Sequence, residues 1–191
     1  MADDPAGIGL AKMPCALIMM GISGSGKSTI GEKLAARLRF SYQDGDTFHP
    51  ASNVAKMSAG QPLTDDDRRP WLQAIADEID RLCGEGRHAV IACSALKRTY
   101  RDILVHGRDD VRIVYLRGSQ PLIASRLAQR THHFMPPELL ASQFKTLEPP
   151  APAEHPITVS VDAPVDRIVD DIVTQLQPGA AVSCADRRSR A

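Results

Sequence analysis

The stretch Gly21-Ile-Ser-Gly-Ser-Gly-Lys27-Ser28 decides the fold of this chain. It fits the pattern G-x-x-x-x-G-K-[ST], in which glycines let backbone N–H groups turn inward around phosphate oxygens. The apolar run Ala16 to Met20 precedes this loop and predicts a buried strand. Behind the loop, apolar residues recur at helical spacing, at Ile30, Leu34, Ala35 and Leu38. A strand, a glycine loop and a helix are the context that the pattern requires.

The loop residues have expected roles in binding ATP. Lys27 should reach the β- and γ-phosphates, and Ser28 should place its hydroxyl on Mg²⁺. The residues expected to bind ATP in this segment are Gly21, Ser23, Gly24, Ser25, Gly26, Lys27, Ser28 and Thr29. A glycine turn with a surface lysine is the alternative, and the strand and helix around the loop argue against it.

Composition and charge limit which kinds of partner the chain can bind. Lys plus Arg and Asp plus Glu number 23 each among 191 residues, so no net field attracts nucleic acid or an anionic membrane. The first 14 residues carry Asp3 and Asp4 where a signal peptide is basic, and no apolar run approaches about 18 residues. The cysteines have no metal-binding spacing, and we expect reduced thiols at Cys15, Cys83, Cys93 and Cys184. A cytoplasmic protein without nucleic-acid or membrane partners is predicted.

Strand-like and helical segments alternate along the rest of the chain, which predicts a mainly parallel sheet with helices on both faces. Further strands are predicted at residues 40–43, 88–93, 111–116 and 157–161. Helices are predicted at residues 64–84, where Thr64 and Asp67 form a capping pattern, and near residues 96–104, 122–128, 139–144 and 165–176. We expect an N-terminal extension at 1–14, one domain at 15–177 with a flap at about 130–152, and a disordered tail at 178–191.

Polar residues follow the second strand, at the carboxyl edge of the sheet where open α/β folds bind ligands. One carboxylate of the pair Asp44 and Asp46 can hold Mg²⁺ through water, while the other accepts a hydrogen bond from an acceptor hydroxyl. An Asx turn is the alternative for this pair. The segment that follows supplies donors suited to a polyhydroxy acid, at His49, Asn53, Lys56, Arg68 and Arg69, and Ser94 and Lys97 follow the third strand at the same edge.

Solvated charge is the alternative for several of these donors. Arg68 can pair with the acids of Asp65 to Asp67 on an exposed face, and Lys97 can lie in solvent at the start of a helix. Arg126 and Arg130 are four residues apart, on one predicted helix face that leads into the flap. Two guanidinium groups there suit the charge of a transferring phosphoryl group, and an exposed basic face is the alternative.

Two other classes of phosphate-binding protein lack support in the sequence. A GTPase is expected to carry N-K-x-D for guanine, and no Asn of this chain is followed by Lys. A motor ATPase usually ends an apolar strand with an acid that holds Mg²⁺, whereas the strand here ends Ala92-Cys93-Ser94. Phosphoryl transfer to a small acceptor is the function that these features favour.

The chain resembles the small gluconokinases of the P-loop type, akin to shikimate kinase and adenylate kinase, from about Leu17 to Leu176. The stretches that carry the resemblance are Gly21 to Thr29, Asp44 to Pro50, Asn53, Lys56-Met57, Pro62 to Arg68, Pro70 to Leu72, Cys93 to Arg98, Ser142 to Phe144 and Leu147-Glu148. The glycine-rich run that shikimate kinase has at its third strand is absent, and Cys93 to Lys97 stands in its place. That departure argues against shikimate as the acceptor.

The resemblance implies a P-loop NTPase fold with sheet order 2-3-1-4-5, a closing LID and a homodimer. It also implies transfer of the ATP γ-phosphate to the 6-hydroxyl of D-gluconate, with Mg²⁺. By residue, it puts Asp44 near the metal and Asp46 on the acceptor hydroxyl, and it puts Arg68 on the acceptor carboxylate. Arg126 and Pro164 then lie near adenine and Arg130 near the phosphates, so that the catalytic residues are Lys27, Asp46 and Arg130.

Two alternatives to a gluconokinase stay open at this point. A kinase for another small hydroxy acid differs only in its acceptor pocket. A nucleotide-binding regulator without catalysis is expected to have lost Lys27 or the flap arginines, and all of these are present.

Overall fold

Five parallel strands form the centre of the structure, a computed structural model that describes residues 13–129 and 137–177. Their order is β2-β3-β1-β4-β5, and all four pairings are parallel. The strands are β1 (Ala16–Met20), β2 (Ser41–Asp44), β3 (Ala89–Ala92), β4 (Val111–Arg117) and β5 (Ile157–Ser160). The expected fold class and sheet order are confirmed.

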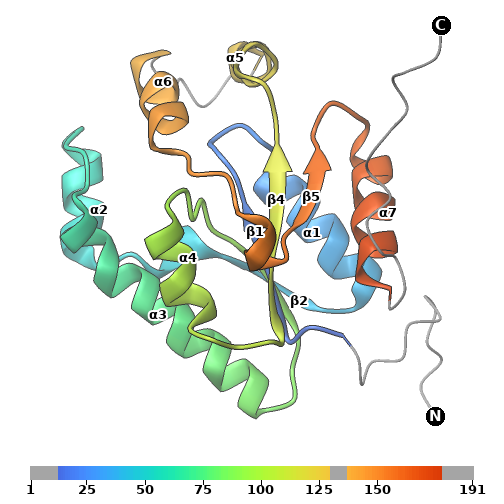
Figure 1. Cartoon of the computed structure of the whole chain (residues 1–191). Coiled ribbons are helices and arrows are strands. Elements are labelled where there is room, and N and C mark those ends of the chain that lie inside the picture. The colour runs from blue at the N-terminus through green and yellow to red at the C-terminus, as the bar shows by residue number, and fades with distance from the viewer. Residues whose placement is uncertain (1–12, 130–136, 178–191) are drawn as a thin grey trace, which may run out of the picture.

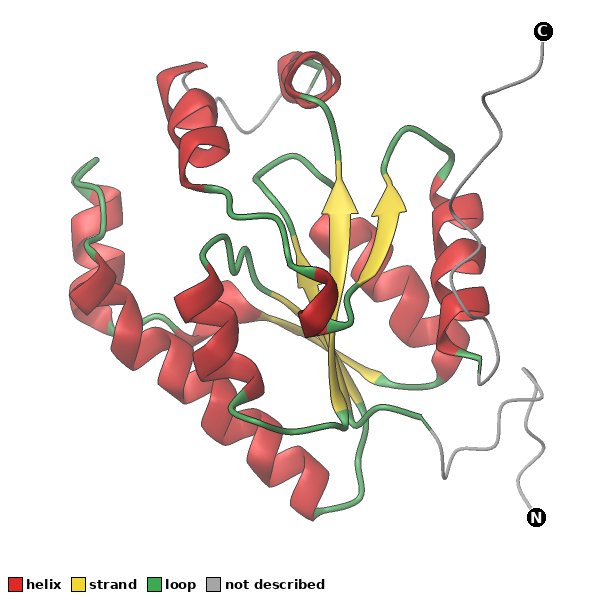
Figure 2. Cartoon of the chain, viewed as in Figure 1, coloured by secondary structure: helices red, strands yellow, loops and turns green. Residues whose placement is uncertain are grey.

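Helices cover both faces of the sheet (Figures 1 and 2). They are α1 (Lys27–Leu38), α2 (Ala51–Ser58), α3 (Asp65–Gly84), α4 (Arg98–Val105), α5 (Gln120–Ala128), α6 (Pro137–Thr146) and α7 (Val165–Leu176), with short 3-10 helices η2 (Gly45–Phe48) and η3 (Pro152–Glu154). Helices α1 and α7 lie on one face, and α3 and α4 lie on the other. Within the described ranges, every helix is too short or too polar to cross a membrane.

Strand β1 separates two apolar cores. All of its side chains are buried, and alternate residues enter opposite clusters because a strand has a period of two. Leu17 and Met19 pack with α1 and α7, whereas Ile18 and Met20 pack with α3 and α4. Each fully buried aliphatic side chain contributes about 1.5–3 kcal/mol. This burial fixes the carboxyl end of β1, from which the glycine loop leaves.

Two elements show where local pattern succeeds and where it fails. Helix α3 begins with the predicted capping box, because the Thr64 Oγ1 accepts from the Asp67 N–H and the Thr64 N–H donates to the Asp67 carboxylate. Helix α2 was not predicted, since its apolar residues Val54 and Met57 are exposed and the buried residue is Asn53. In this short helix the apolar residues therefore do not mark the buried face.

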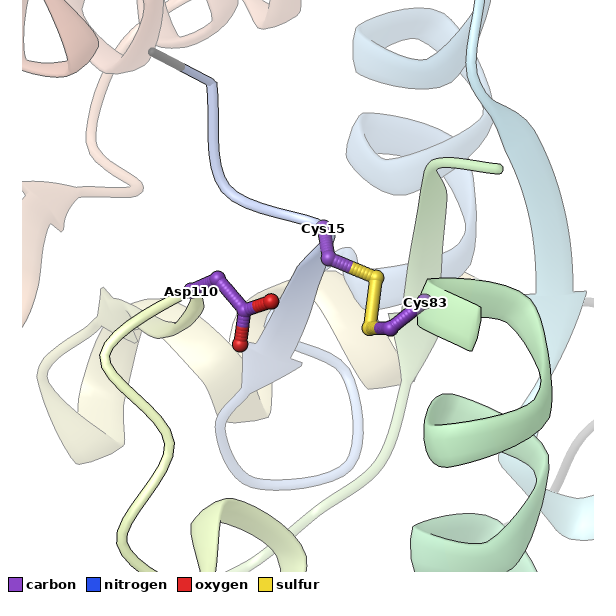
Figure 3. Close-up of side chains that lie close together, drawn as sticks. All are labelled: Cys15, Cys83 and Asp110. Carbon is purple, nitrogen blue, oxygen red and sulfur yellow. A yellow bond between two sulfur atoms is a disulfide. The ribbon is translucent and has the colours of Figure 1, made fainter. Parts of the chain in front are cut away.

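The expectation of four reduced cysteines is wrong for two of them. Cys15 and Cys83 form a disulfide between the start of β1 and the end of α3, with Cα atoms 5.6 Å apart (Figure 3). The two residues are 68 apart in sequence, so only the packing of α3 across the sheet brings them together. Cys93 is a buried free thiol, and Cys184 lies outside the described residues.

Asp110 lies beside this disulfide and completes a group that resembles a metal site (Figure 3). A metal ligand must be a thiolate, however, and the two sulfur atoms are bonded to each other. Both carboxylate oxygens of Asp110 also accept hydrogen bonds from Arg108, at 2.9 Å each. The group is therefore a structural cross-link next to an ion pair.

Loss of the disulfide is expected to lower the free energy of unfolding by about 2 kcal/mol, at the lower end of the usual range, since β-sheet bonds still hold Cys15. Urea unfolding of the oxidised protein, the reduced protein and the Cys15→Ser/Cys83→Ser variant measures this effect. Reduction of the double variant serves as the control and should change nothing. Equal stability of the oxidised and reduced wild type would contradict the prediction.

Candidate functional site

The glycine loop connects β1 to α1 at the carboxyl edge of the sheet. Gly24 and Gly26 have φ angles of 85° and 94°, which residues with a side chain rarely adopt. The Lys27 ammonium folds back over the loop, where it donates to the carbonyl oxygens of Gly21 (3.0 Å) and Ile22 (3.2 Å). The loop therefore places its backbone turn, a helix N-terminus and a cation together, which is the arrangement that binds phosphate.

Two hydrogen bonds join the glycine loop to the segment after β3 and to α6. The Gly21 N–H donates to the carbonyl oxygen of Ser94, which follows β3 (3.3 Å). The Ser23 N–H donates to the side-chain oxygen of Gln143 on α6 (2.7 Å). Ser94 thus lies next to the loop as expected, whereas the contact of Gln143 was not anticipated.

Asp44 and Asp46 stand at the end of β2 and the start of η2. The Asp44 Oδ1 accepts from the Asp46 N–H (3.0 Å), so the alternative of an Asx turn is realised for this carboxylate. Gly45 lies between them, where an added Cβ would stand 2.3 Å from the Ala92 carbonyl oxygen of β3. The Gly45 carbonyl also accepts from Trp71 Nε1 (2.7 Å). Close approach of the backbone therefore fixes both acids.

Ser28 of α1 and Asp44 of β2 both affect the pKa of Tyr42. Burial raises the pKa of the Tyr42 phenol, while the Ser28 hydroxyl opposes that rise and the Asp44 carboxylate adds to it. Ser28 and Asp44 therefore act on one side chain from two different elements. A hydroxyl and a carboxylate are ligand types that Mg²⁺ prefers, so these residues fit the ion.

His49 is held in one orientation by its neighbours. Its ring stacks on Trp71 with centroids 4.2 Å apart. The Asn53 Nδ2 donates to the Asp67 carbonyl oxygen (2.7 Å), which can only accept, so the amide nitrogen also faces the His49 Nδ1 at 3.3 Å. In neutral His49 the Nδ1 accepts, and the Nε2 therefore carries the proton and can donate to a ligand.

Burial and the charge of Arg68 lower the pKa of His49 below 6.5, although Asp46 acts in the opposite direction. Because folding favours the neutral ring, its contribution to stability is complete above pH 6.5 and is lost as the pH falls below that value. NMR titration of the ring protons should give a midpoint below 6.5. The signal is assigned by its absence in His49→Gln, and a midpoint at or above 6.5 would contradict this geometry.

Two cations predicted from separate segments converge on Asp65. Lys97 Nζ lies 2.6 Å from its carboxylate, Tyr100 Oη donates to it at 2.5 Å, and Arg68 Nη1 lies 3.8 Å away. Both cations also lie over the Tyr100 ring, 5.6 and 5.9 Å from its centroid. Hydrogen bonds from Lys97 and Tyr100 lower the pKa of Asp65, which stays ionised. We name Asp65, Arg68, Lys97 and Tyr100 the Asp65 cluster.

Some of the predicted ligand-binding cations instead form contacts within the protein, as the alternative of exposed ion pairs predicts. Arg68 Nη1 donates to the Leu63 carbonyl oxygen (2.7 Å), and Lys56 pairs with Asp67 at 2.6 Å. That hydrogen bond from Lys56, together with those from Thr64, lowers the pKa of Asp67 to about 2. Lys56 is therefore engaged at the start of α3, with 41% of its side chain exposed, and Arg68 and Lys97 have side-chain exposures of 31% and 29%.

Arg126 lies on the opposite side of the glycine loop. Its Nη2 donates to the Val161 carbonyl oxygen after β5 (2.5 Å). The side chain lines a cavity of about 300 Å³ together with Gly24, Gly26, Thr29, Val165 and Ile168, among other residues. Pro164 is the residue before α7, at the same edge of the sheet. Arg130 lies outside the described residues.

Cys93 is the buried thiol that follows β3, and charged groups of both signs affect its pKa. Burial raises the pKa of its thiol to about 12, so it is no nucleophile at neutral pH. The charge of Lys27 opposes that rise, and the charges of Asp44 and Asp46 add to it. The charges of Lys27, Asp44 and Asp46 therefore all affect the pKa of this buried thiol.

Three residues of the site were given no role from the sequence: Trp71, Tyr100 and Gln143. Trp71 is the sole tryptophan of the chain, which is a signal in itself, but its spacing with Leu72 and Ile75 also fits a core helix. Tyr100 and Gln143 act through partners that are distant in sequence. Asn53 was expected as a donor, but the helix that positions it was not predicted.

Comparisons with known proteins agree with this geometry. A family model described as an AAA domain matches residues 17–150. A gluconokinase of Gluconobacter oxydans is 43% identical over 164 residues, which cover 86% of this chain and 92% of that protein. The thermoresistant gluconokinase of Escherichia coli is 39% identical over 163 residues, covering 85% and 93%. The crystal structure of a gluconokinase from Sinorhizobium meliloti superimposes with a TM-score of 0.77 at 43% identity, covering 86% and 92%.

Proposed function

The chain belongs to the gluconokinase family, and we propose that it transfers the γ-phosphate of ATP to the 6-hydroxyl of D-gluconate. The observation that carries this proposal is that the glycine loop and the turn of Asp44 and Asp46 both lie against the end of β3. The Gly21 N–H donates to the Ser94 carbonyl oxygen, and Gly45 approaches the Ala92 carbonyl oxygen. The loop that holds Lys27 and the two carboxylates therefore share one edge of the sheet. The products are 6-phospho-D-gluconate and ADP.

Positioning and charge account for most of the proposed catalysis, because the transition state of phosphoryl transfer is loose. Lys27 neutralises charge on the β- and γ-phosphates. Asp46 accepts a hydrogen bond from the 6-hydroxyl and takes its proton as the new bond to phosphorus forms. Ser28, and Asp44 through water, would hold Mg²⁺, which would supply positive charge to the phosphates.

The Asp65 cluster is proposed to bind the gluconate carboxylate. Arg68 and Lys97 supply two positive charges, and Asp65 supplies one negative charge. One positive charge is therefore left for an anionic ligand. His49, whose pKa both Asp46 and Arg68 affect, has its Nε2–H to offer and can donate to another hydroxyl of the acceptor.

An ADP-release assay with a panel of acceptors tests this function. D-gluconate should give the highest kcat/KM among gluconate, other hexonates, shikimate and glucose. A second acid with an equal or higher value would favour the alternative of a kinase for another small hydroxy acid. Binding of ATP without turnover of any acid would favour a regulator.

Further proposals rest on the family and on the composition of the sequence. They are a homodimer, a cytoplasmic location without nucleic-acid or membrane partners, adenine bound beside Arg126 and Pro164, and a flap at about 130–152 that brings Arg130 to the phosphates. Helix α6 lies in the described part of this flap. Light scattering of the purified protein tests the dimer directly.

A further inference from the structure

The contact between α6 and the glycine loop carries an inference that rests on the proposed function. Gln143 Oε1 accepts from the Ser23 N–H at 2.7 Å, across 120 residues of sequence. A backbone N–H of the loop that can turn toward phosphate is thus bonded to a neutral side-chain amide. Gln143 was assigned no role by its position in the sequence.

The base of α6 is anchored, so the position of Gln143 is fixed from behind. After α6, the Glu148 N–H donates to the Leu96 carbonyl oxygen (2.8 Å), and the Glu148 carboxylate accepts from the Arg98 N–H (2.6 Å). Arg101, with 2% of its side chain exposed, donates to the Glu148 carbonyl oxygen and forms two hydrogen bonds with Glu154. Gln143 extends from this fixed segment to the loop.

The loop has an adenine side and an acceptor side. Gly24, Gly26 and Thr29 line the cavity next to Arg126. Gly21, in contrast, bonds to Ser94 in the acceptor region, and Ser23 bonds to Gln143. Gln143 therefore lies at the end of the loop where the terminal phosphate of ATP meets the acceptor.

The amide nitrogen of Gln143 has a donor capacity that the described part of the chain does not use. Among the described residues, no acceptor binds its Nε2. The Nε2 is bonded to the same carbon as Oε1, so it also lies beside the loop, with two N–H groups. Because Ser23 holds the oxygen, the orientation of these donors is set before the ligand binds.

We propose that Gln143 is a catalytic residue whose Nε2 donates to an oxygen of the transferring phosphoryl group, while its Oε1 stays on the Ser23 N–H. A neutral amide supplies donors without a charge that has to be desolvated. Donors aimed at the site where charge develops accelerate phosphoryl transfer most when they are preorganised. If Gln143 only linked α6 to the glycine loop, its side-chain oxygen would be sufficient and the Nε2 donors would have no role.

Gln143→Glu separates these two roles, because a carboxylate still accepts from Ser23 but replaces the Nε2 donors with a negative oxygen. Calorimetry should show at least about tenfold weaker binding of a non-hydrolysable ATP analogue, as expected when a hydrogen bond to a charged group becomes a repulsion. The affinity for ADP, which lacks the terminal phosphate, should change less than about threefold. Gln143→Leu should lower kcat by about tenfold or more, as for other lost donors.

Lys145→Ala, an exposed change on the same helix, is the matched control and should keep wild-type binding and turnover. Wild-type affinity of Gln143→Glu for the ATP analogue would overturn the inference, as would equal weakening of analogue and ADP. The binding experiment needs no acceptor, so it tests Gln143 separately from the proposed function. If the wild type binds the analogue but does not phosphorylate gluconate, the proposed function is wrong. The affinities of Gln143→Glu for the analogue and for ADP then still decide whether Gln143 contacts the terminal phosphate.

Discussion

Arg68→Ala is expected to remove most of the preference of the enzyme for gluconate over glucose. In the wild type, glucose should be phosphorylated at least about a thousandfold less efficiently than gluconate, within the range for a missing polar partner. Gluconate has a carboxylate on C1 and the reacting hydroxyl on C6, so a cation distant from the phosphate selects the hydroxyl. Glucose lacks this charge and leaves the Asp65 cluster with an unpaired cation.

The ratio of kcat/KM for the two sugars measures this preference. In Arg68→Ala it should fall mainly because the KM for gluconate rises, whereas Asp46→Asn should slow turnover with a smaller effect on KM. Arg69→Ala is the matched control, because Arg69 is the next residue of α3 and is exposed. An unchanged ratio in Arg68→Ala would exclude Arg68 as the carboxylate ligand, and Lys97 would be tested next.

Lys27→Ala is expected to lower kcat by at least about a hundredfold, as when other charge-stabilising groups are removed. The Lys27 ammonium contacts two carbonyl oxygens of its own loop and enters neither of the two apolar cores. The fold should therefore persist, and a thermal unfolding midpoint near that of the wild type would show this.

Lys33→Ala provides the control for that variant. Lys33 lies on the same helix, is half exposed and pairs with Asp166 on α7, so its loss should leave kcat unchanged. Retention of wild-type kcat by Lys27→Ala would contradict the assignment of the phosphate loop. Arginine at position 27 should not restore activity, because its planar group cannot occupy the place of a compact ammonium.

The sequence by itself determined the fold and the place of the glycine loop in it. The glycine loop, its flanking strand and helix, and the capping box of α3 depend on residues that are close in the chain. Helix α7 also begins and ends at the predicted residues, because its apolar spacing is regular. The alternation of strands and helices then restricts the sheet to a parallel arrangement.

Only the tertiary structure decided which distant groups meet. Lys97 donates a hydrogen bond to Asp65, which is 32 residues away, and the Ser23 N–H donates to Gln143, which is 120 residues away. Cys15 forms a disulfide with Cys83. Such pairs depend on how helices lie across the sheet, and local periodicity carries no information about that placement. Hydrophobic spacing states which face of an element is buried, whereas the partner of a polar side chain is set by the packing of whole elements against one another.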